Sequence, residues 1–272
     1  DQNLRISEEF VLGIGGVRAV RALGLEPDVW HMNEGHSAFL GLERARNIVQ
    51  EQGLTFAEAQ EVVRASTVFT THTPVPAGHD VFSWELMDRF FSAYWPQLGL
   101  SREYFLELAR HDQTWGPSFS MTVLALRMAG RTNGVAALHG EVSRAMWQWL
   151  WPNTPVDEVP IGHVTNGVHL ETWLGPEMAA LLDAHLAADW RERLHEPAVL
   201  DGIYAIPDQE FWQAQRRAKQ RLVNFVRSRA RARAERQGEA PDILDALEQV
   251  LDPDAFTIGF ARRFATYKRA TL

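Results

Sequence analysis

Short β-rich runs that end in polar loops and then lead into helical segments recur along this chain. Residues 27–32 end at the polar turn 33–36, and residues 67–71 end at the loop 72–79. A third apolar run, residues 256–260, leads into a basic turn. Strands that alternate with helices predict an α/β fold, in which polar side chains at the strand ends gather beside a cleft.

The segments between these runs carry helical periodicity. We expect a helix over residues 5–23, whose glycine cluster, beginning at Gly13, favours close packing of another element over nucleotide binding. Thr55 and Glu58 have the spacing of a capping box at a helix start. The other helices expected from the periodicity span residues 37–52, 56–66, 83–95, 101–110, 118–129, 137–150, 176–187 and 208–237.

The basic turn carries four cations within eight residues, namely Arg262, Arg263, Lys268 and Arg269. Where a strand leads into a helix, free backbone N–H groups and the helix dipole attract anions. Guanidinium and ammonium groups add charge-assisted hydrogen bonds to phosphate oxygens. The sequence therefore predicts that this turn binds phosphate.

The other polar loops carry groups that can hydrogen-bond sugar hydroxyls. These candidates are Asn33, Glu34 and His36 in the first loop, His72 in the second and Asn166 in an Asn-Gly turn. Each alone is also compatible with a structural role, as a turn residue, a satisfied buried His or a helix cap. We expect no metal site, because no ligand pair has a suitable spacing and the first loop supplies too few ligands.

Composition narrows the classes of function. The chain has 272 residues, a net charge of −8 and no Cys. The negative charge argues against broad binding of nucleic acid. The absence of Cys excludes disulfides and thiolate metal sites, and it agrees with a cytoplasmic protein. No apolar run is long enough for a transmembrane helix, so we expect no membrane partner.

Five segments, taken in order, resemble motifs of the α-glucan phosphorylases, the family of glycogen, starch and maltodextrin phosphorylases, in its shorter bacterial form. They are residues 31–39, 69–80, 133–143, 163–169 and 262–269. The order of all five, rather than any one of them, carries the resemblance, which extends over nearly the whole chain.

The resemblance implies a glycosyltransferase-B fold, in which two Rossmann-like α/β domains face a deep cleft. Residues 1–253 are then expected to be the later part of an N-terminal glucan-binding domain. Residues 254–272 are expected to be the first strand and the phosphate-binding turn of a C-terminal domain. We therefore expect the chain to be an internal piece of a longer polypeptide.

The resemblance also implies an activity. The family degrades α-1,4-glucans with orthophosphate and releases glucose 1-phosphate with retained anomeric configuration. Its cofactor is pyridoxal phosphate, held as a Schiff base by a Lys, and the cofactor phosphate exchanges a proton with the substrate phosphate. By position, Arg263 and Lys268 resemble the catalytic phosphate-site residues, and Lys268 and Arg262 those at the cofactor phosphate. His72 and Asn166 resemble residues that bond the glucosyl hydroxyls.

Asn33, Glu34 and His36 resemble a substrate-binding loop beside the catalytic pocket. The Schiff-base Lys and the Gly-rich phosphate loop of the family have no match here, so we expect this chain alone to be inactive. The implied partners are an α-1,4-glucan and orthophosphate, and a homo-oligomer is compatible with the resemblance. Two alternatives remain open: a nucleotide-sugar-dependent glucan glycosyltransferase of the same fold, and a non-catalytic glucan-binding piece.

Overall fold

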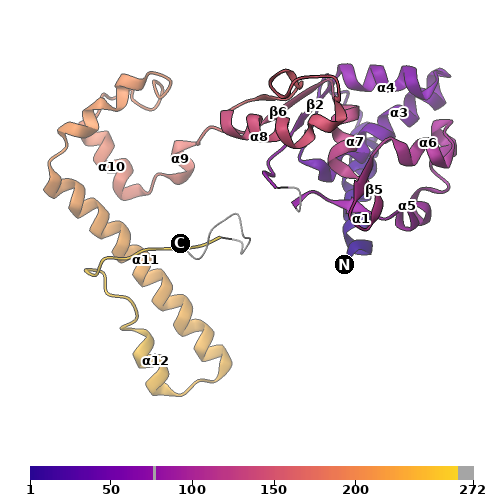
Figure 1. Cartoon of the computed structure of the whole chain (residues 1–272). Coiled ribbons are helices and arrows are strands. Elements are labelled where there is room, and N and C mark those ends of the chain that lie inside the picture. Colours follow the sequence, from indigo (N-terminus) through magenta and orange to yellow (C-terminus); the bar gives the residue numbers. More distant parts are fainter. Residues whose placement is uncertain (76–77, 263–272) are drawn as a thin grey trace. The chain divides into compact units, whose positions relative to one another are not determined.

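The computed structural model describes residues 1–75 and 78–262, which belong to two compact units (Figure 1). The first unit is Asp1–Gly167 and the second is Val168–Leu272. This division differs from the domain boundary that the sequence predicts at residue 254. That boundary stays a prediction, because residues 263–272 lie outside the described part.

A parallel four-stranded sheet runs through the first unit, with the order β1-β2-β6-β7. The register places Asn33 opposite Thr70 and Thr70 opposite Asn133. The first two strands confirm the predicted runs. β6 was not predicted, because Arg-Thr-Asn-Gly has little intrinsic β propensity and becomes a strand through its pairing with β2. The strands are β1 (Trp30–Asn33), β2 (Thr67–Thr70), β6 (Arg131–Gly134) and β7 (Gly162–His163).

A second, antiparallel sheet has the order β3-β5-β4. The sequence predicted helices over residues 101–110 and 118–129, so this sheet corrects both helix bounds. Gly116 opens β5 with φ 127°, a conformation that side-chain periodicity does not reveal and that other residues rarely adopt. The strands are β3 (Val81–Phe82), β4 (Arg110–Gln113) and β5 (Gly116–Ser120).

Helices pack around these two sheets. The predicted capping box is present at the start of α4, where the Glu58 N–H donates to Thr55 Oγ1 and the Thr55 N–H donates to the Glu58 carboxylate. The helical elements of the first unit are α1 (Gln2–Phe10), the π-helical η1 (Val11–Gly15), α2 (Gly16–Ala22), η2 (Gly35–Ser37), α3 (Phe39–Gln52), α4 (Phe56–Ala65), α5 (Trp84–Phe91), η4 (Trp95–Leu98), α6 (Arg102–Glu107), α7 (Met121–Met128), α8 (Ala137–Trp147), η5 (Gln148–Leu150) and η6 (Val156–Glu158).

The glycine cluster of the first helical stretch permits close packing, as the sequence predicted. A Cβ atom at Gly13 would lie 2.8 Å from both Phe39 Cβ and Leu40 N. Only a residue without a side chain therefore fits where η1 meets α3. Phe39 is fully buried there, and its ring centroid lies 4.7 Å from that of Phe91 in the aromatic core.

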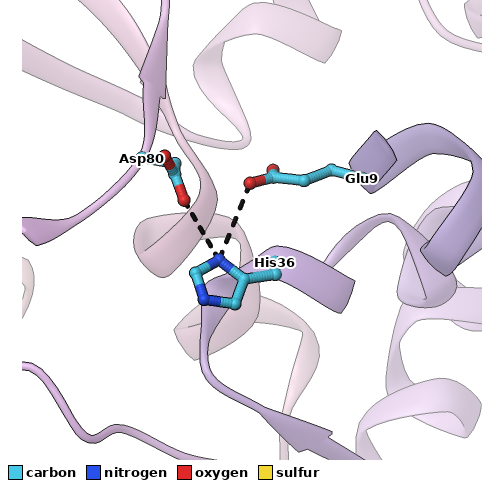
Figure 2. Close-up of side chains that lie close together, drawn as sticks. All are labelled: Glu9, His36 and Asp80. Carbon is cyan, nitrogen blue, oxygen red and sulfur yellow. Dashed lines mark hydrogen bonds and ion pairs between the residues drawn. The ribbon is translucent and has the colours of Figure 1, made fainter. Parts of the chain in front are cut away.

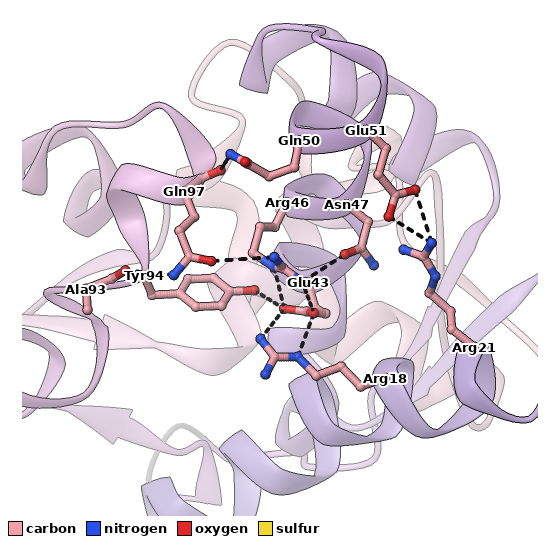
Figure 3. Close-up of polar contacts among 10 residues, drawn as sticks. All are labelled: Arg18, Arg21, Glu43, Arg46, Asn47, Gln50, Glu51, Ala93, Tyr94 and Gln97. Atoms are coloured by element: carbon pink, nitrogen blue, oxygen red, sulfur yellow. Dashed lines mark hydrogen bonds and ion pairs between the residues drawn. The ribbon is translucent and has the colours of Figure 1, made fainter.

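The carboxylate of Glu43 is fully buried in this unit and is held by three side chains (Figure 3). Glu43 accepts hydrogen bonds from Arg46 at 2.7 Å, Arg18 at 2.8 Å and the Tyr94 hydroxyl at 2.6 Å. Burial alone would raise the pKa of Glu43, but these three donors lower it below its ordinary value. These hydrogen bonds join α2, α3 and the segment before η4 through the ionised carboxylate of Glu43.

The second unit is helical and has a small core of its own around Trp190, Leu181 and Ala214. In the part of the chain that the structure describes, no helix has the length and apolar composition that a bilayer crossing needs. The helical elements are α9 (Leu170–Trp173), α10 (Pro176–His185), η7 (Pro197–Ala205), α11 (Asp208–Gln237) and α12 (Pro241–Leu247).

The strand predicted at residues 256–260 is absent from the structure. Phe256 and Ile258 are largely exposed, and no strand is assigned in the described residues of this unit. An apolar run becomes a strand only when a neighbouring strand satisfies its backbone groups. The prediction of a strand at residues 256–260 is therefore wrong for this chain.

Candidate active site

The loops that follow the four parallel strands lie at one edge of the sheet, because parallel strands share the same carboxyl edge. Backbone hydrogen bonds connect these loops across the edge, so a shift of one loop disturbs the next. The bonds, each 2.8–3.0 Å long, run from Glu34 N–H to Thr70 O, Thr71 N–H to Asn133 O, Val164 N–H to Gly134 O and Asn166 N–H to Val135 O.

Three of the predicted substrate-binding residues are exposed at this edge. Asn33 ends β1, His72 follows β2 by two residues and Asn166 follows β7 by three residues. The sheet therefore brings together segments that are far apart in the sequence. An amide and an imidazole both donate and accept hydrogen bonds, which suits the hydroxyl groups of a sugar.

Glu34, another predicted substrate-binding residue, is buried and faces protein groups. Its Oε2 accepts hydrogen bonds from the His72 backbone N–H at 2.7 Å and from Thr73 Oγ1 at 2.9 Å. Its Oε1 accepts a bond of 3.3 Å from Thr71 Oγ1. The carboxylate thus holds the start of the loop that carries His72.

The backbone of Glu34 is strained. Its φ of 67° and ψ of 173° lie in a region that is populated almost only by glycine. For any other residue this conformation costs about 1–3 kcal/mol. The strain persists because the Glu34 N–H is bonded to Thr70 O and because Gly35 packs so closely that a Cβ atom there would lie 3.2 Å from Thr122 N.

His36 belongs to a compact cluster of charged groups (Figure 2). Its Nδ1 lies 3.0 Å from Asp80 Oδ2 and 3.7 Å from Glu9 Oε1. Arg5 joins the same cluster, with Nη2 2.9 Å from Asp80 Oδ2 and Nε 3.1 Å from Glu9 Oε1. The cluster links α1, the turn after β1 and the residue before β3.

The cluster changes the proton affinity of its members. Burial raises the pKa of Glu9 to about 7. The hydrogen bond with Asp80, and then the nearby carboxyl group of Glu9, raise the pKa of His36 to about 9. Burial opposes ionisation of Asp80, but hydrogen bonds from His36 and Arg5 hold its pKa well below the ordinary value. The two carboxyl groups beside His36 therefore favour its protonated form.

The same three side chains bring potential metal-ligating atoms within 4.8 Å of one another. Glu9 and Asp80 come from segments that are distant from His36 in the sequence, so the spacing of ligands near His36 could not predict this cluster. Arg5 Nη2 lies 2.6 Å from His36 Nδ1 and donates to Asp80, while Arg5 Nε lies 3.1 Å from Glu9 Oε1. The chain itself therefore supplies the positive charge that balances Asp80 and Glu9, and we assign no metal to this cluster.

The predicted phosphate site is almost entirely outside the described residues. Arg263 and Lys268 belong to the part that is not described, and Arg262 is exposed. A groove of about 620 Å³ in the second unit is lined by Trp212, Lys219 and Phe256, among others, and none of the predicted site residues that the structure describes lines it. The Lys219 ammonium group donates to the backbone carbonyl of Ala255 there.

Several residues that shape the candidate site were not predicted from the sequence. Glu9, Arg5 and Asp80 surround His36, although only Asp80 lies within a quoted motif. His139 Nδ1 accepts a bond of 3.2 Å from the Val135 N–H, which fixes the turn after β6. The helical periodicity of residues 5–23 predicted that Glu9 is in a helix, but no local signal predicted that it is buried.

A family model described as carbohydrate phosphorylase matches residues 25–238. The chain belongs to the carbohydrate phosphorylase family. With the parallel sheet, this membership confirms the predicted α/β fold class of a phosphorylase-type glycosyltransferase. The match includes the four loops at the sheet edge and ends before the basic turn.

Individual members of the phosphorylase family are similar along the whole chain. Maltodextrin phosphorylase from Thermococcus litoralis is 43% identical, over 98% of this chain and 31% of that protein. Glycogen phosphorylase from Mycobacterium tuberculosis is also 43% identical, over 100% of this chain and 32% of that protein. Glycogen phosphorylase from Aquifex aeolicus is 34% identical, over 100% of this chain and 39% of that protein. The chain thus spans about a third of the length of these phosphorylases.

Proposed function

We propose that the protein to which this chain belongs is an α-1,4-glucan phosphorylase. It transfers a terminal glucosyl unit from a glycogen-like or maltodextrin-like glucan to orthophosphate and gives glucose 1-phosphate. The names of the relatives, maltodextrin and glycogen phosphorylase, support this substrate class. The absence of Cys is compatible with the cytoplasmic location included in the proposal.

One structural observation supports the sugar-binding part of this proposal. Asn33, His72 and Asn166 are exposed at a single sheet edge whose loops are connected by backbone hydrogen bonds. In the proposal, His72 and Asn166 bond hydroxyl groups of the glucosyl unit, while the turn 33–36 borders the pocket. Groups whose positions are fixed beforehand can orient a sugar without a further ordering cost.

The phosphate-binding part of the proposal rests on the basic turn. Arg263 and Lys268 are proposed to bind the substrate phosphate, and Arg262 and Lys268 to contact the phosphate of pyridoxal phosphate. Guanidinium and ammonium groups have the charge and the donors that phosphate requires, and Arg262 is exposed and thus accessible to an anion. When bound, the cofactor supplies a phosphate group that exchanges a proton with the substrate phosphate. The cations offset charge on two adjacent phosphates.

The test uses the full-length protein that contains this chain, reconstituted with pyridoxal phosphate. Incubation with maltoheptaose and orthophosphate should release glucose 1-phosphate, and arsenate or water alone should not yield that product. His72→Ala and Asn166→Ala should raise KM for the glucan, lower kcat, or both. Glucosyl transfer from a nucleotide sugar, without phosphorolysis, would instead establish the synthase alternative and end the proposal.

The isolated 272-residue chain provides a second test. Because Lys219 is the single Lys outside the basic turn and its ammonium group is bonded to Ala255, we expect no Schiff-base absorbance with pyridoxal phosphate. We also expect no release of glucose 1-phosphate. A clear cofactor band together with phosphorolysis would show that the assignment of the cofactor Lys to another part of the protein is wrong.

A further inference from the structure

We infer that Glu34 is a positioning residue, which acts on the substrate only through the loop that carries His72. This inference rests on the proposed function, in which His72 bonds the glucosyl unit. It revises the role that the resemblance suggested for Glu34, because a carboxylate directed at protein groups has a different function from one directed at a sugar.

The contacts of the carboxylate carry the inference. Glu34 is 8% exposed, and both of its oxygens accept hydrogen bonds from the loop. The shortest of these, at 2.7 Å, comes from the backbone N–H of His72 itself. The hydroxyl groups of Thr71 and Thr73 donate the other two. Three consecutive residues of the loop are therefore bound to one side chain.

The backbone of Glu34 explains how this side chain reaches the loop. Glycine would adopt φ 67° and ψ 173° freely, yet it would provide no carboxylate. A strained non-glycine residue at a site of this kind indicates that its side chain is needed in that direction. In this conformation the carboxylate accepts hydrogen bonds from the neighbouring loop after β2.

The same turn also holds the other end of the loop. His36, two residues after Glu34, is 3.0 Å from Asp80, at the end of the loop that precedes β3. The turn after β1 is therefore attached to the loop at Thr71–Thr73 and again at Asp80. Of these two attachments, the one at Glu34 includes the backbone N–H of His72, so it holds the backbone from which that ring projects.

The experiment is a double-mutant cycle in the full-length protein. Glu34→Gly removes the carboxylate and relieves the backbone strain, so the variant should fold. We expect a loss of about 10- to 100-fold in kcat/KM for maltoheptaose, the range for loss of a charge-assisted hydrogen bond. If Glu34 acts through His72, the double variant with His72→Ala should be no less active than His72→Ala alone. Independent, multiplying losses would overturn the inference.

Glu34→Gln tests the same point with a conservative change. The amide oxygen can still accept from the His72 N–H and Thr73, while Thr71 can accept from the amide nitrogen. We expect this variant to retain activity within about fivefold, because a neutral hydrogen bond replaces a charge-assisted one. A loss as large as that of Glu34→Gly, with the loop unchanged, would show that the carboxylate acts directly on the substrate. Glu61→Gln, on the exposed side of α4, is the matched control.

A structural measurement separates this inference from the proposed function. In the isolated chain, the amide proton of His72 should resonate at low field and exchange slowly, and Glu34→Gly should abolish both properties. In Glu34→Gln, the His72 amide proton should still be shifted to low field and protected from exchange, but less than in the unmodified chain. If the full-length protein has no phosphorylase activity while the amide behaves in this way, the proposed function is wrong but Glu34 still positions His72. An unchanged His72 amide in Glu34→Gly would refute the positioning role.

Discussion

The backbone N–H of His72 donates a 2.7 Å hydrogen bond to the carboxylate of Glu34, although the two residues are 38 positions apart. Glu34 makes this contact from a backbone conformation that favours glycine. The hydrogen bonds of its carboxylate thus offset part of the strain in its own backbone. Removing the side chain and relieving the strain are two separable effects.

Comparison of two variants at position 34 measures the strain. Glu34→Ala and Glu34→Gly both remove the carboxylate, but only glycine adopts φ 67° without strain. We expect Glu34→Gly to be more stable than Glu34→Ala by about 1–2 kcal/mol in urea unfolding of the chain. At the control position Glu61, inside α4, the order should reverse by about 1 kcal/mol, because alanine favours a helix. Equal stability of the two variants at position 34 would show that the backbone there is not strained.

The sequence predicted the parts of this site that local patterns encode. The runs before Asn33 and His72 are apolar and rich in β-formers, and the polar residues that follow are typical of loops at strand ends. Parallel pairing places the loops after these strands at one edge of the sheet. The predicted fold class was therefore enough to predict that the two loops lie close together. The resemblance to the family also rested on the order in which the motifs of these loops occur along the chain.

The contacts between side chains could not be predicted in this way. Nothing near Glu34 in the sequence distinguishes a carboxylate that binds a sugar from one that binds the His72 loop. Likewise, the burial of Glu9 and its proximity to His36 depend on how α1 packs against residues far along the chain. β4 and β5 were missed for a related reason, because the turn at Gly116 and the pairing with β3 override the helical periodicity.

The buried carboxylate of Glu43 provides a prediction on stability. Glu43→Gln weakens three charge-assisted hydrogen bonds, and because Arg18 and Arg46 remain partly exposed to water, we expect a loss of about 2–4 kcal/mol in the free energy of unfolding. Tyr94→Phe removes one hydrogen bond to the charged group and should cost about 1.5–3 kcal/mol. Arg21→Gln breaks only an exposed pair with Glu51 and should cost less than about 1 kcal/mol. Urea titrations measure whether the loss of stability is largest for Glu43→Gln and smallest for Arg21→Gln. A small loss for Glu43→Gln would contradict this order.

The raised pKa of Glu9 predicts a dependence of stability on pH. Its folded-state value, about 7, exceeds the ordinary value of 4.5, so the folded protein binds this proton more tightly than the unfolded chain. The stability that the proton contributes is fully present below about pH 4.5 and is lost as the pH rises through about 7.

Glu9→Gln removes this titration. The free energy of unfolding of the variant minus that of the unmodified chain should increase by roughly 1–3 kcal/mol from pH 5 to pH 8, because only the unmodified chain loses the stabilising proton. Urea unfolding at the two pH values measures the change. A pH-independent effect of Glu9→Gln would mean that the carboxyl group does not titrate in this range.

The proximity of Asp80 predicts the titration of His36. The imidazole signals of His36 should titrate with a midpoint near pH 9 in NMR spectra, and Asp80→Asn should move this midpoint downward, because Asp80 is the largest cause of the raised pKa. The stabilising effect of the His36 proton is fully present below pH 6.5 and is lost as the pH rises through about 9. Asp80→Asn should therefore destabilise the chain more at pH 6 than at pH 10. Asp112→Asn, which changes an exposed partner of Arg110, should leave the His36 midpoint unchanged.

Two glycines of the first helical stretch should respond in opposite ways to the same substitution. A Cβ atom at Gly13 would meet Phe39 and Leu40 at 2.8 Å, so Gly13→Ala must push α3 away and should cost about 1–3 kcal/mol. No atom lies within 4 Å of a Cβ atom at Gly16, which has helical dihedral angles. Gly16→Ala should therefore stabilise the chain by about 0.5–1 kcal/mol, since alanine has less backbone freedom to lose. Thermal unfolding of both variants measures the contrast. If Gly13→Ala were as stable as Gly16→Ala, the close contact of η1 with α3, on which the placement of the His36 turn depends, would be wrong.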